Sequence, residues 1–357
     1  MTPAPYDEGP GPGAGLRTTP PDQEARAAGA LYGLAIGDAL GMPTQMLPRP
    51  LVVERYGPVV DGFHPAPPDH PLAAGMPAGA VTDDTEQAML VAGLLLDGHG
   101  TADPAELARR LVAWEDSMRA RGSLDLLGPS TKRAVSRVLA GASVDEAGRY
   151  GDTNGAAMRI TPVGVAVPSS DLDVLVDRVV DVSKLTHNTG VALAAAAAVA
   201  AAVSAGIDGA TVAEAVRAAR AAAALGARRG HWVAGADVAA RIAWATILVA
   251  GLPGETVCDR VYTLVGTSLA AQESVPAAFA ILSACRDDPW RAVRLAASVG
   301  GDCDTIAAVA GAVAGACHGV AAFPAGARRL VATANALPLD ETAAALLALR
   351  AKARPDG

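Results

Sequence analysis

The stretch DQEARAAGALYGLAIGDALG, residues 22–41, decides the fold of the chain. Asp22 follows a proline and is a suitable N-cap, so the sequence predicts a helix that runs from there towards Ala39. Glycines recur along it at four-residue spacing, at Gly29, Gly33, Gly37 and Gly41. Residues four apart lie on one helix face, and each interior glycine costs about 1 kcal/mol relative to alanine. We therefore expect another helix or a ligand to approach the backbone closely along this glycine face.

The rest of the chain predicts more helices. Residues 42–80 are dense in proline and glycine and indicate a long loop, whereas helical periodicity returns near Asp83 and continues almost to the end. The expected helices cover residues 84–97, 104–120, 129–140, 171–186, 189–205, 211–224, 236–250, 254–270, 275–284, 289–298, 305–319, 325–335 and 340–352. The sequence shows neither a series of alternating strands nor a fixed-period repeat. We predict an all-α fold with a single compact multi-helix domain at residues 22–353, preceded by a disordered N-terminal tail at residues 1–21.

The composition suits closely packed helices. Of the 357 residues, 51% are hydrophobic but only 3% are aromatic, so the core consists mostly of Ala, Val and Leu. The net charge of −8 provides no basic surface, and we expect neither a nucleic-acid nor a membrane partner. The four cysteines form no CxxC pair and no signal-peptide pattern opens the chain, which indicates a cytoplasmic protein. A monomer is the default expectation.

The stretch from Val191 to Val203 is apolar throughout. It ends at Ser204 and Gly206, short of the roughly 20 residues that cross a bilayer, and most of its residues are alanine. We therefore expect a buried core helix rather than a membrane span.

The first acidic cluster is Thr82-Asp83-Asp84-Thr85-Glu86, between the long loop and an apolar helix. One interpretation is structural: Thr82 caps the helix, and acidic residues in the first turn complement the helix dipole. The other is a metal site, because adjacent carboxylates and a threonine hydroxyl form a hard oxygen set that suits Mg²⁺, Mn²⁺ or Ca²⁺. Taken alone, the cluster leaves both interpretations open.

The second acidic cluster is Gly300-Gly301-Asp302-Cys303-Asp304-Thr305, ahead of a helix that is almost entirely small and apolar. Two aspartates exceed what a cap requires, and the paired glycines permit unusual backbone angles. A helix of this composition belongs inside the protein, so its carboxylates need a partner, and a metal ion provides one. Together the two clusters supply four carboxylates, enough to hold two divalent ions.

Two further stretches carry polar groups. Gly151-Asp152-Thr153-Asn154-Gly155 indicates either a tight turn before a helix or a ligand loop lined by backbone amides. His187 lies at a helix junction, where a histidine is more often a capping or solvent-facing residue than a functional one. The remaining histidines show no metal-ligand spacing.

Other chemistries fit less well. The sequence contains no nucleophile elbow, no P-loop and no strand-linked dinucleotide fingerprint. Asp83-Asp84 resembles the aspartate-rich motif of terpene synthases, which are also all-helical and use Mg²⁺. Those enzymes enclose carbocations with aromatic walls, and an aromatic content of 3% is poor material for such a cavity.

Five motifs, taken in chain order, resemble those of the ADP-ribosylglycohydrolases, the group that contains dinitrogenase-reductase-activating glycohydrolase. They are Gly37-Asp38-Ala39-Leu40-Gly41, Thr82-Asp83-Asp84-Thr85, Asn154-Gly155-Ala156-Ala157-Met158-Arg159, Thr186-His187 and Gly301-Asp302-Cys303-Asp304-Thr305. The resemblance covers about residues 26–325. It implies an all-α fold, a site for two divalent cations, Mg²⁺ or Mn²⁺, and hydrolysis of a glycosidic bond at the anomeric carbon of ribose.

The resemblance also implies roles for individual residues. The expected metal ligands are Thr82, Asp83, Asp84, Asp302, Asp304 and Thr305, and the four aspartates among them are the expected catalytic residues. The expected contacts to ADP-ribose are Gly151, Asp152, Thr153, Asn154, Gly155 and His187, with Gly128 and Thr131 from a more loosely matching loop.

Gln45 departs from the family pattern. Many members carry a glutamate at this position, near the metals, and a neutral amide is neither a general base nor an anionic ligand, although it can orient water or a hydroxyl. We therefore expect Gln45 to contact the substrate. An ADP-ribosyl-arginine type of conjugate on a protein is the family default. The alternatives are a nucleoside or a small ribosylated metabolite as substrate, or a module that binds ADP-ribose without cleaving it.

Overall fold

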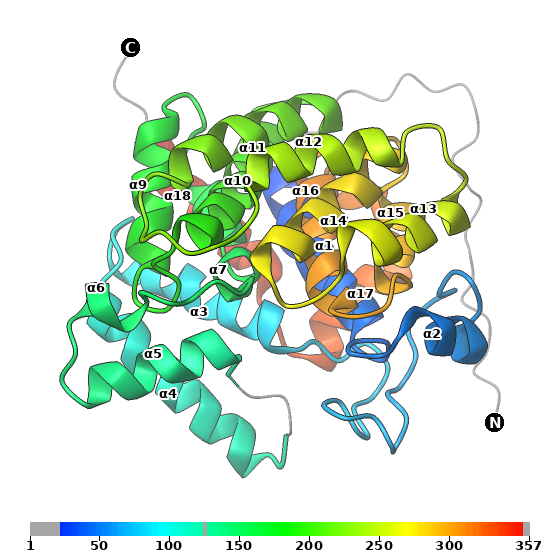
Figure 1. Ribbon diagram of the computed structural model, residues 1–357, viewed down its shortest axis with the longest axis horizontal. Coiled ribbons are helices and arrows are strands. Elements are labelled where there is room, and N and C mark those ends of the chain that lie inside the picture. Colours follow the sequence, from blue (N-terminus) through cyan, green and yellow to red (C-terminus); the bar gives the residue numbers. More distant parts are fainter. Residues whose placement is uncertain (1–21, 124–126, 353–357) are drawn as a thin grey trace.

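The computed structural model describes residues 22–123 and 127–352, and the predicted tail at residues 1–21 lies outside this part of the chain. In the described ranges all regular structure is helical, which confirms the predicted all-α, single-domain fold class (Figure 1). The α-helices are α1 (Gln23–Gly41), α2 (Arg49–Tyr56), α3 (Asp83–Asp97), α4 (Pro104–Ala120), α5 (Pro129–Leu139), α6 (Val144–Ala147), α7 (Gly155–Met158), α8 (Thr161–Ala166), α9 (Leu172–Ser183), α10 (Gly190–Ile207), α11 (Val212–Gly226), α12 (Val238–Leu248), α13 (Gly254–Arg260), α14 (Ala271–Ala284), α15 (Pro289–Ala297), α16 (Cys303–His318), α17 (Ala325–Ala334) and α18 (Leu339–Lys352). A π-helical turn, η1 (Val261–Val265), and a 3₁₀ turn, η2 (Val320–Ala322), complete the set.

The glycine face of α1 packs against α16 at the centre of the molecule (Figure 1). A Cβ added at Gly33 would stand 2.0 Å from the carbonyl oxygen of Gly311, and one at Gly37 would stand 2.1 Å from that of Ala307. Any side chain on this face would therefore collide with the backbone of α16. The expectation of a close backbone approach is confirmed, and the approaching element is a helix.

The alanine-rich helix α10 forms the other half of the core. By length and composition, this helix is apolar enough to cross a membrane. However, 89% of its 18-residue apolar stretch is buried inside the protein, against neighbours that include α11, α16 and α8. The prediction of a buried core helix is confirmed. Small side chains allow this packing because they let neighbouring helix axes approach closely.

A buried arginine ties α1 to the ends of both α10 and α16. Arg26 donates through Nη1 to the carbonyl oxygens of Gly206 (2.8 Å), Ala316 (3.2 Å) and Cys317 (2.5 Å). The last carbonyls of a helix have no partner within it, so a cation there satisfies them and complements the helix dipole. One side chain near the N-terminal end of α1 thus fixes its position relative to two central helices.

Several predicted boundaries were wrong. The predicted loop at residues 42–80 contains α2, where Arg49 donates to the carbonyl oxygens of Pro58 and Ser298 and pairs with Asp259. The single helix predicted at 254–270 ends at 260, continues as η1 and stops at Gly266, which has a φ of +89°. The helix predicted at 275–284 begins four residues earlier and tolerates Pro276 in its interior. Tertiary contacts override local propensity at such places.

Candidate active site

The start of α3 is capped by a carboxylate from another helix. Asp38 on α1 accepts the backbone N–H of Thr82 at both of its oxygens (3.0 Å each), and also the backbone N–H (3.1 Å) and hydroxyl (2.5 Å) of Thr85. The Thr82 side chain accepts the N–H of Asp84, so the predicted cap is present as well. Because these groups satisfy the N–H donors of Thr82, Asp84 and Thr85, the carboxylates of Asp83 and Asp84 are not needed as their caps.

The start of α16 uses the conformational freedom of its two glycines. Gly300 and Gly301 have φ values of +83° and +74°, and a Cβ at Gly301 would stand 2.3 Å from the carbonyl oxygen of Thr267. Asp302 occupies the N-cap position without making a side-chain capping bond. Its Oδ2 instead accepts a short 2.5 Å hydrogen bond from the Nδ2 of Asn154. The carboxylate therefore contacts the Gly151–Gly155 loop and makes no capping bond to the backbone of its own helix.

The two acidic clusters meet at one place. The Thr305 hydroxyl on α16 lies 3.0 Å and 3.2 Å from the two carboxylate oxygens of Asp84 on α3. Asp84, Asp302 and Asp304 are at most 4% exposed, whereas Asp83 is half-buried at the margin. Residues separated by about 220 positions in the chain thus share one buried, oxygen-rich site.

The electrostatics of this site are unfavourable for the charged carboxylates. Burial raises the pKa of Asp84 well above its usual range, and the neighbouring charges of Asp304, Asp38, Asp83 and Asp302 raise it further. Burial also raises the pKa of Asp302 to about 6, against the opposing effect of its bonds from Asn154 and Thr305. The pKa of Asp38 is raised to about 6 for the same reason, although its bonds from Thr82 and Thr85 lower it. A cation among these oxygens would relieve both the desolvation and the mutual repulsion.

The predicted ligand loop lies beside His187. The Thr153 hydroxyl is 2.9 Å from the Nε2 of His187, and a Cβ at Gly155 would stand 2.8 Å from its Cε1. Gly151 is packed against the same segment, because a Cβ there would meet the carbonyl oxygen of Thr186 at 2.1 Å. His187 is fully buried, so it is not the solvent-facing histidine that its position in the sequence most often indicates.

The remaining predicted substrate contacts are Thr131, Asp152 and Gly128, and they differ in how they are placed relative to the ligand loop. The Thr131 hydroxyl on α5 is 3.6 Å from the place where a Cβ of Gly155 would stand, so Thr131 borders the loop. Asp152 is exposed, and its carbonyl oxygen accepts the backbone N–H of Ala271. Gly128 caps α5, and no other part of the described chain lies within 4 Å of where its Cβ would stand.

Gln45 is buried next to the end of α1. Its backbone N–H donates to the carbonyl oxygen of Gly41 (2.9 Å), and its carbonyl oxygen accepts Nε2–H of His70 (3.0 Å). The side-chain Nε2 has no hydrogen-bond partner among the described residues, although the residue is only 3% exposed. A buried donor without a partner is costly and is typical of a group that awaits a ligand.

Three functional residues were missed by the prediction from sequence. Asp38 positions the first cluster, while Gln87 and Arg159 connect it to His187 through buried hydrogen bonds. A signal for Asp38 existed, since it is the only charged residue in α1 after Arg26. Gln87 contacts Asp83 only four positions away, but the partners of Arg159 lie 72 and 27 positions away in the sequence, and no local pattern indicated those contacts.

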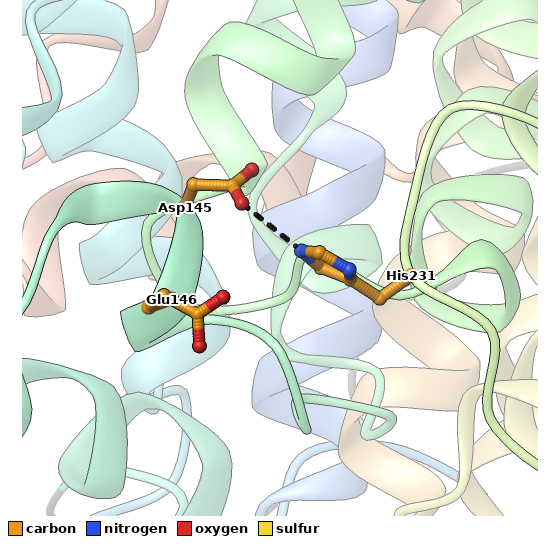
Figure 2. Close-up of side chains that lie close together, drawn as sticks. All are labelled: Asp145, Glu146 and His231. Atoms are coloured by element: carbon orange, nitrogen blue, oxygen red, sulfur yellow. Dashed lines mark hydrogen bonds and ion pairs between the residues drawn. The ribbon is translucent and has the colours of Figure 1, made fainter.

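A second group of potential metal ligands lies on the surface. Within the described ranges, Asp145, Glu146 and His231 are the one group of three His, Cys, Asp or Glu side chains in which one ligand atom from each lies within 4.8 Å of the others (Figure 2). Asp145 accepts from Asn188 (2.8 Å) and lies 3.2 Å from the His231 Nε2, and Glu146 pairs with Arg149 (2.9 Å). These ordinary surface contacts account for the group, so we assign no metal to it.

Comparisons with known proteins give this geometry a context. Residues 19–356 match the profile of the ADP-ribosylglycohydrolase family. The chain is 36% identical over 326 residues to the uncharacterised protein YegU of Escherichia coli, covering 91% of this chain and 97% of the relative. It is 30% identical over 175 residues to ADP-ribosyl-[dinitrogen reductase] glycohydrolase of Rhodospirillum rubrum, covering 48% of this chain and 54% of that protein. A solved ADP-ribosylglycohydrolase-related protein complex superposes with a TM-score of 0.68 at 26% identity, over 93% of this chain and 99% of that chain.

Proposed function

The chain belongs to the ADP-ribosylglycohydrolase family, and from this membership we propose that it is a divalent-cation-dependent hydrolase that cleaves the glycosidic bond at the anomeric carbon of ribose in an ADP-ribosyl conjugate. The observation that carries the proposal is the hydrogen bond from Thr305 to Asp84, which joins the two acidic clusters in one buried site. A surface cap would need neither this convergence nor this burial.

The residues present fit a divalent-cation site. Carboxylate and hydroxyl oxygens are the ligands that Mg²⁺ and Mn²⁺ prefer, and we propose that Thr82, Asp83, Asp84, Asp302, Asp304 and Thr305 hold two such ions. Bound ions there would supply Lewis-acid activation of water and stabilisation of developing charge. Buried carboxylates with raised pKa values are the donor set that a cation neutralises best.

Residues of the protein itself carry out proton transfer, orientation of the aspartates and substrate binding. One of the four aspartates accepts the proton of the attacking water. The reaction passes through an oxocarbenium-like transition state at the anomeric carbon. Asn154 orients Asp302 by donating to its Oδ2, and Asp38 holds the turn that carries Asp83 and Asp84. The Gly151–Gly155 loop and His187 form the wall against which the ribosyl group binds.

The substrate class is the part of the proposal that Gln45 influences. Conjugates of the ADP-ribosyl-arginine type are the first candidates, since the Rhodospirillum rubrum relative is named for the removal of ADP-ribose from dinitrogen reductase. The neutral Gln45 amide, whose Nε2 awaits an acceptor, favours as the second candidate a nucleoside or a small ribosylated metabolite. We further propose that the protein acts in the cytoplasm as a monomer.

The decisive experiment is a substrate panel. The protein is incubated with Mg²⁺ or Mn²⁺ and ADP-ribosyl-arginine, ADP-ribosyl-serine, O-acetyl-ADP-ribose or common nucleosides, and the released ribosyl product is detected by chromatography. We expect cleavage of at least one ADP-ribosyl conjugate, with loss on addition of EDTA. The double variant Asp302→Ala/Asp304→Ala should lose turnover, whereas Thr161→Val, which removes a buried hydroxyl that has no hydrogen-bond partner among the described residues, is the matched control and should retain it.

Each outcome of the panel has a definite meaning. Turnover that survives both EDTA and the double substitution contradicts the cation-dependent mechanism. Release of free base from nucleosides alone would move the activity away from ADP-ribosyl conjugates. Binding of ADP-ribose without cleavage of any panel member would identify a binding module instead of an enzyme.

A further inference from the structure

A chain of buried hydrogen bonds runs from the first acidic cluster to the ligand loop. The Nε2 of Gln87 on α3 donates to Oδ2 of Asp83 (3.0 Å), and the Oε1 of Gln87 accepts from Nη1 of Arg159 (2.9 Å). The Nη2 of Arg159 donates in the other direction, to the hydroxyl oxygen of Thr186 (2.6 Å). Thr186 and Arg159 are both 0% exposed, so water does not compete for these bonds.

Arg159 sets the donor-to-acceptor direction of every hydrogen bond in this series. A guanidinium only donates, so Gln87 must present its oxygen to Arg159 and its amide protons to Asp83, and Thr186 must accept. Burial lowers the pKa of Arg159 to about 10, which leaves the side chain protonated at neutral pH. The cationic donor in the middle therefore orients both of its neighbours permanently.

The hydroxyl proton of Thr186 then has one acceptor. The Nδ1 of His187 lies 2.7 Å from the hydroxyl oxygen, and the carbonyl oxygen of Ser183 lies 3.4 Å away. That carbonyl already accepts the backbone N–H groups of Thr186 (3.1 Å) and His187 (2.9 Å), which occupy both of its lone pairs. The Thr186 proton is therefore directed to His187 Nδ1, because this atom is closer and the lone pairs of the competing carbonyl oxygen are occupied.

An imidazole that accepts at Nδ1 carries its proton at Nε2. Burial, and then the charges of Arg159 and Arg133, lower the pKa of His187 well below its usual range, so the ring is neutral and has a single proton. The Nε2–H donates to the hydroxyl oxygen of Thr153 at 2.9 Å. Gly155, packed against Cε1 of the ring, keeps the ring in this orientation.

Thr153 is the last residue in this series of hydrogen bonds. Its hydroxyl oxygen accepts from His187, and within the described residues no acceptor is present for its own proton. We propose that Arg159 is a positioning residue that, through Thr186, holds His187 as the Nε2–H tautomer and so makes the Thr153 hydroxyl a donor to an acceptor oxygen of the substrate, such as a phosphoryl oxygen. The opposite tautomer would turn Thr153 into an acceptor and would repel such an oxygen. The identity of the ligand at Thr153 rests on the proposed function, whereas the tautomer of His187 does not.

The tautomer is measured directly by two-bond ¹⁵N–¹H correlation spectra of the histidine rings in the ligand-free protein. His187 is one of six histidines, and its signals are assigned by their loss in His187→Gln. We expect the Nε2–H tautomer at neutral pH in the wild type and a mixture of the two neutral tautomers in Thr186→Val, which keeps the shape of the side chain without the hydroxyl. Thr161→Val, the control for loss of a buried hydroxyl, should leave the His187 signals unchanged. An Nδ1–H tautomer or an imidazolium in the wild type, or an unchanged tautomer in Thr186→Val, would overturn the proposal.

Calorimetric titration with ADP-ribose tests the consequence for binding. We expect Thr153→Val and Thr186→Val each to weaken binding about tenfold, and the double variant to be no weaker than either single one, because both act through one hydrogen bond to the ligand. Thr186→Val with wild-type affinity would overturn the link between the tautomer and Thr153. A wild-type protein that binds no ADP-ribose would contradict the proposed function, and the ring spectra would still decide whether Thr186 fixes the tautomer.

Discussion

The contact between α1 and α16 makes a quantitative prediction at Gly41, where the glycine face reaches the proposed site. In Gly41→Ala the new Cβ would stand 2.4 Å from the Cα of Asp304, and ordinary van der Waals contact begins at 3.4 Å. The start of α16 must therefore move by about 1 Å, and it carries Asp302 and Asp304 with it. The perturbation is thus a small displacement of two proposed ligands without a change in any of them.

The displacement should cost more activity than stability. Overpacking of a tight core costs about 1–3 kcal/mol, and the better helix propensity of alanine returns at most about 1 kcal/mol at the end of a helix. We expect a net loss of roughly 1–2 kcal/mol in the free energy of unfolding. A misplacement of about 1 Å in a catalytic constellation costs on the order of 100-fold in rate. Urea denaturation and steady-state turnover of the best panel substrate measure the two effects separately.

Two matched glycine substitutions are the controls. Gly29→Ala lies at the far end of the same face, where its Cβ would stand 2.4 Å from the carbonyl oxygen of Gly315, so it should lose similar stability but keep most of the activity. Gly93→Ala on α3 meets only the flexible end of Arg110, at 3.1 Å, and should retain or gain stability. Equal activity in Gly41→Ala and wild type, or equal loss of activity at Gly29 and Gly41, would refute the reasoning.

Three more predictions follow from the buried polar groups. Asp38→Asn replaces an acceptor by a donor and leaves a buried N–H at the start of α3 unpaired, so urea denaturation should show a loss of about 1–3 kcal/mol; an unchanged midpoint contradicts the proposed trans-helix cap. The pKa of Asp302 is raised from 3.8 to about 6 in the fold, so its contribution to stability is present below pH about 4 and is lost as the pH rises through about 6. In EDTA, Asp302→Asn should therefore gain stability relative to wild type between pH about 4 and 7, and a pH-independent difference would refute this linkage. Gln45→Glu should raise the ratio of ADP-ribosyl-arginine to nucleoside cleavage about tenfold, and an unchanged ratio of rates would show that Gln45 does not influence the substrate.

The close approach of two backbones was predictable from the glycine pattern. Four glycines on one face of a helix have a thermodynamic cost that only close packing offsets, and the structure places α16 there. The two acidic clusters were also recognisable, because each combines carboxylates and hydroxyls at a helix start. In contrast, α2 was not recognisable in the proline-rich stretch, since the bonds of Arg49 to Pro58 and Ser298 stabilise it from outside.

The partners of individual side chains were not predictable in the same way. Asp38 binds Thr82 and Thr85 across more than forty positions of the chain, and Arg159 binds Gln87 across seventy-two. The sequence by itself determined most of the long helices, the glycine face and the types of ligand atoms, because periodicity and composition report local backbone preference and the need for burial. Only the tertiary structure decided that Asp38 caps α3 and that Arg159 directs the hydrogen bonds of His187. Those choices depend on donor–acceptor distances of about 3 Å between side chains on different helices. The packing of the whole core sets these distances, and no local pattern encodes them.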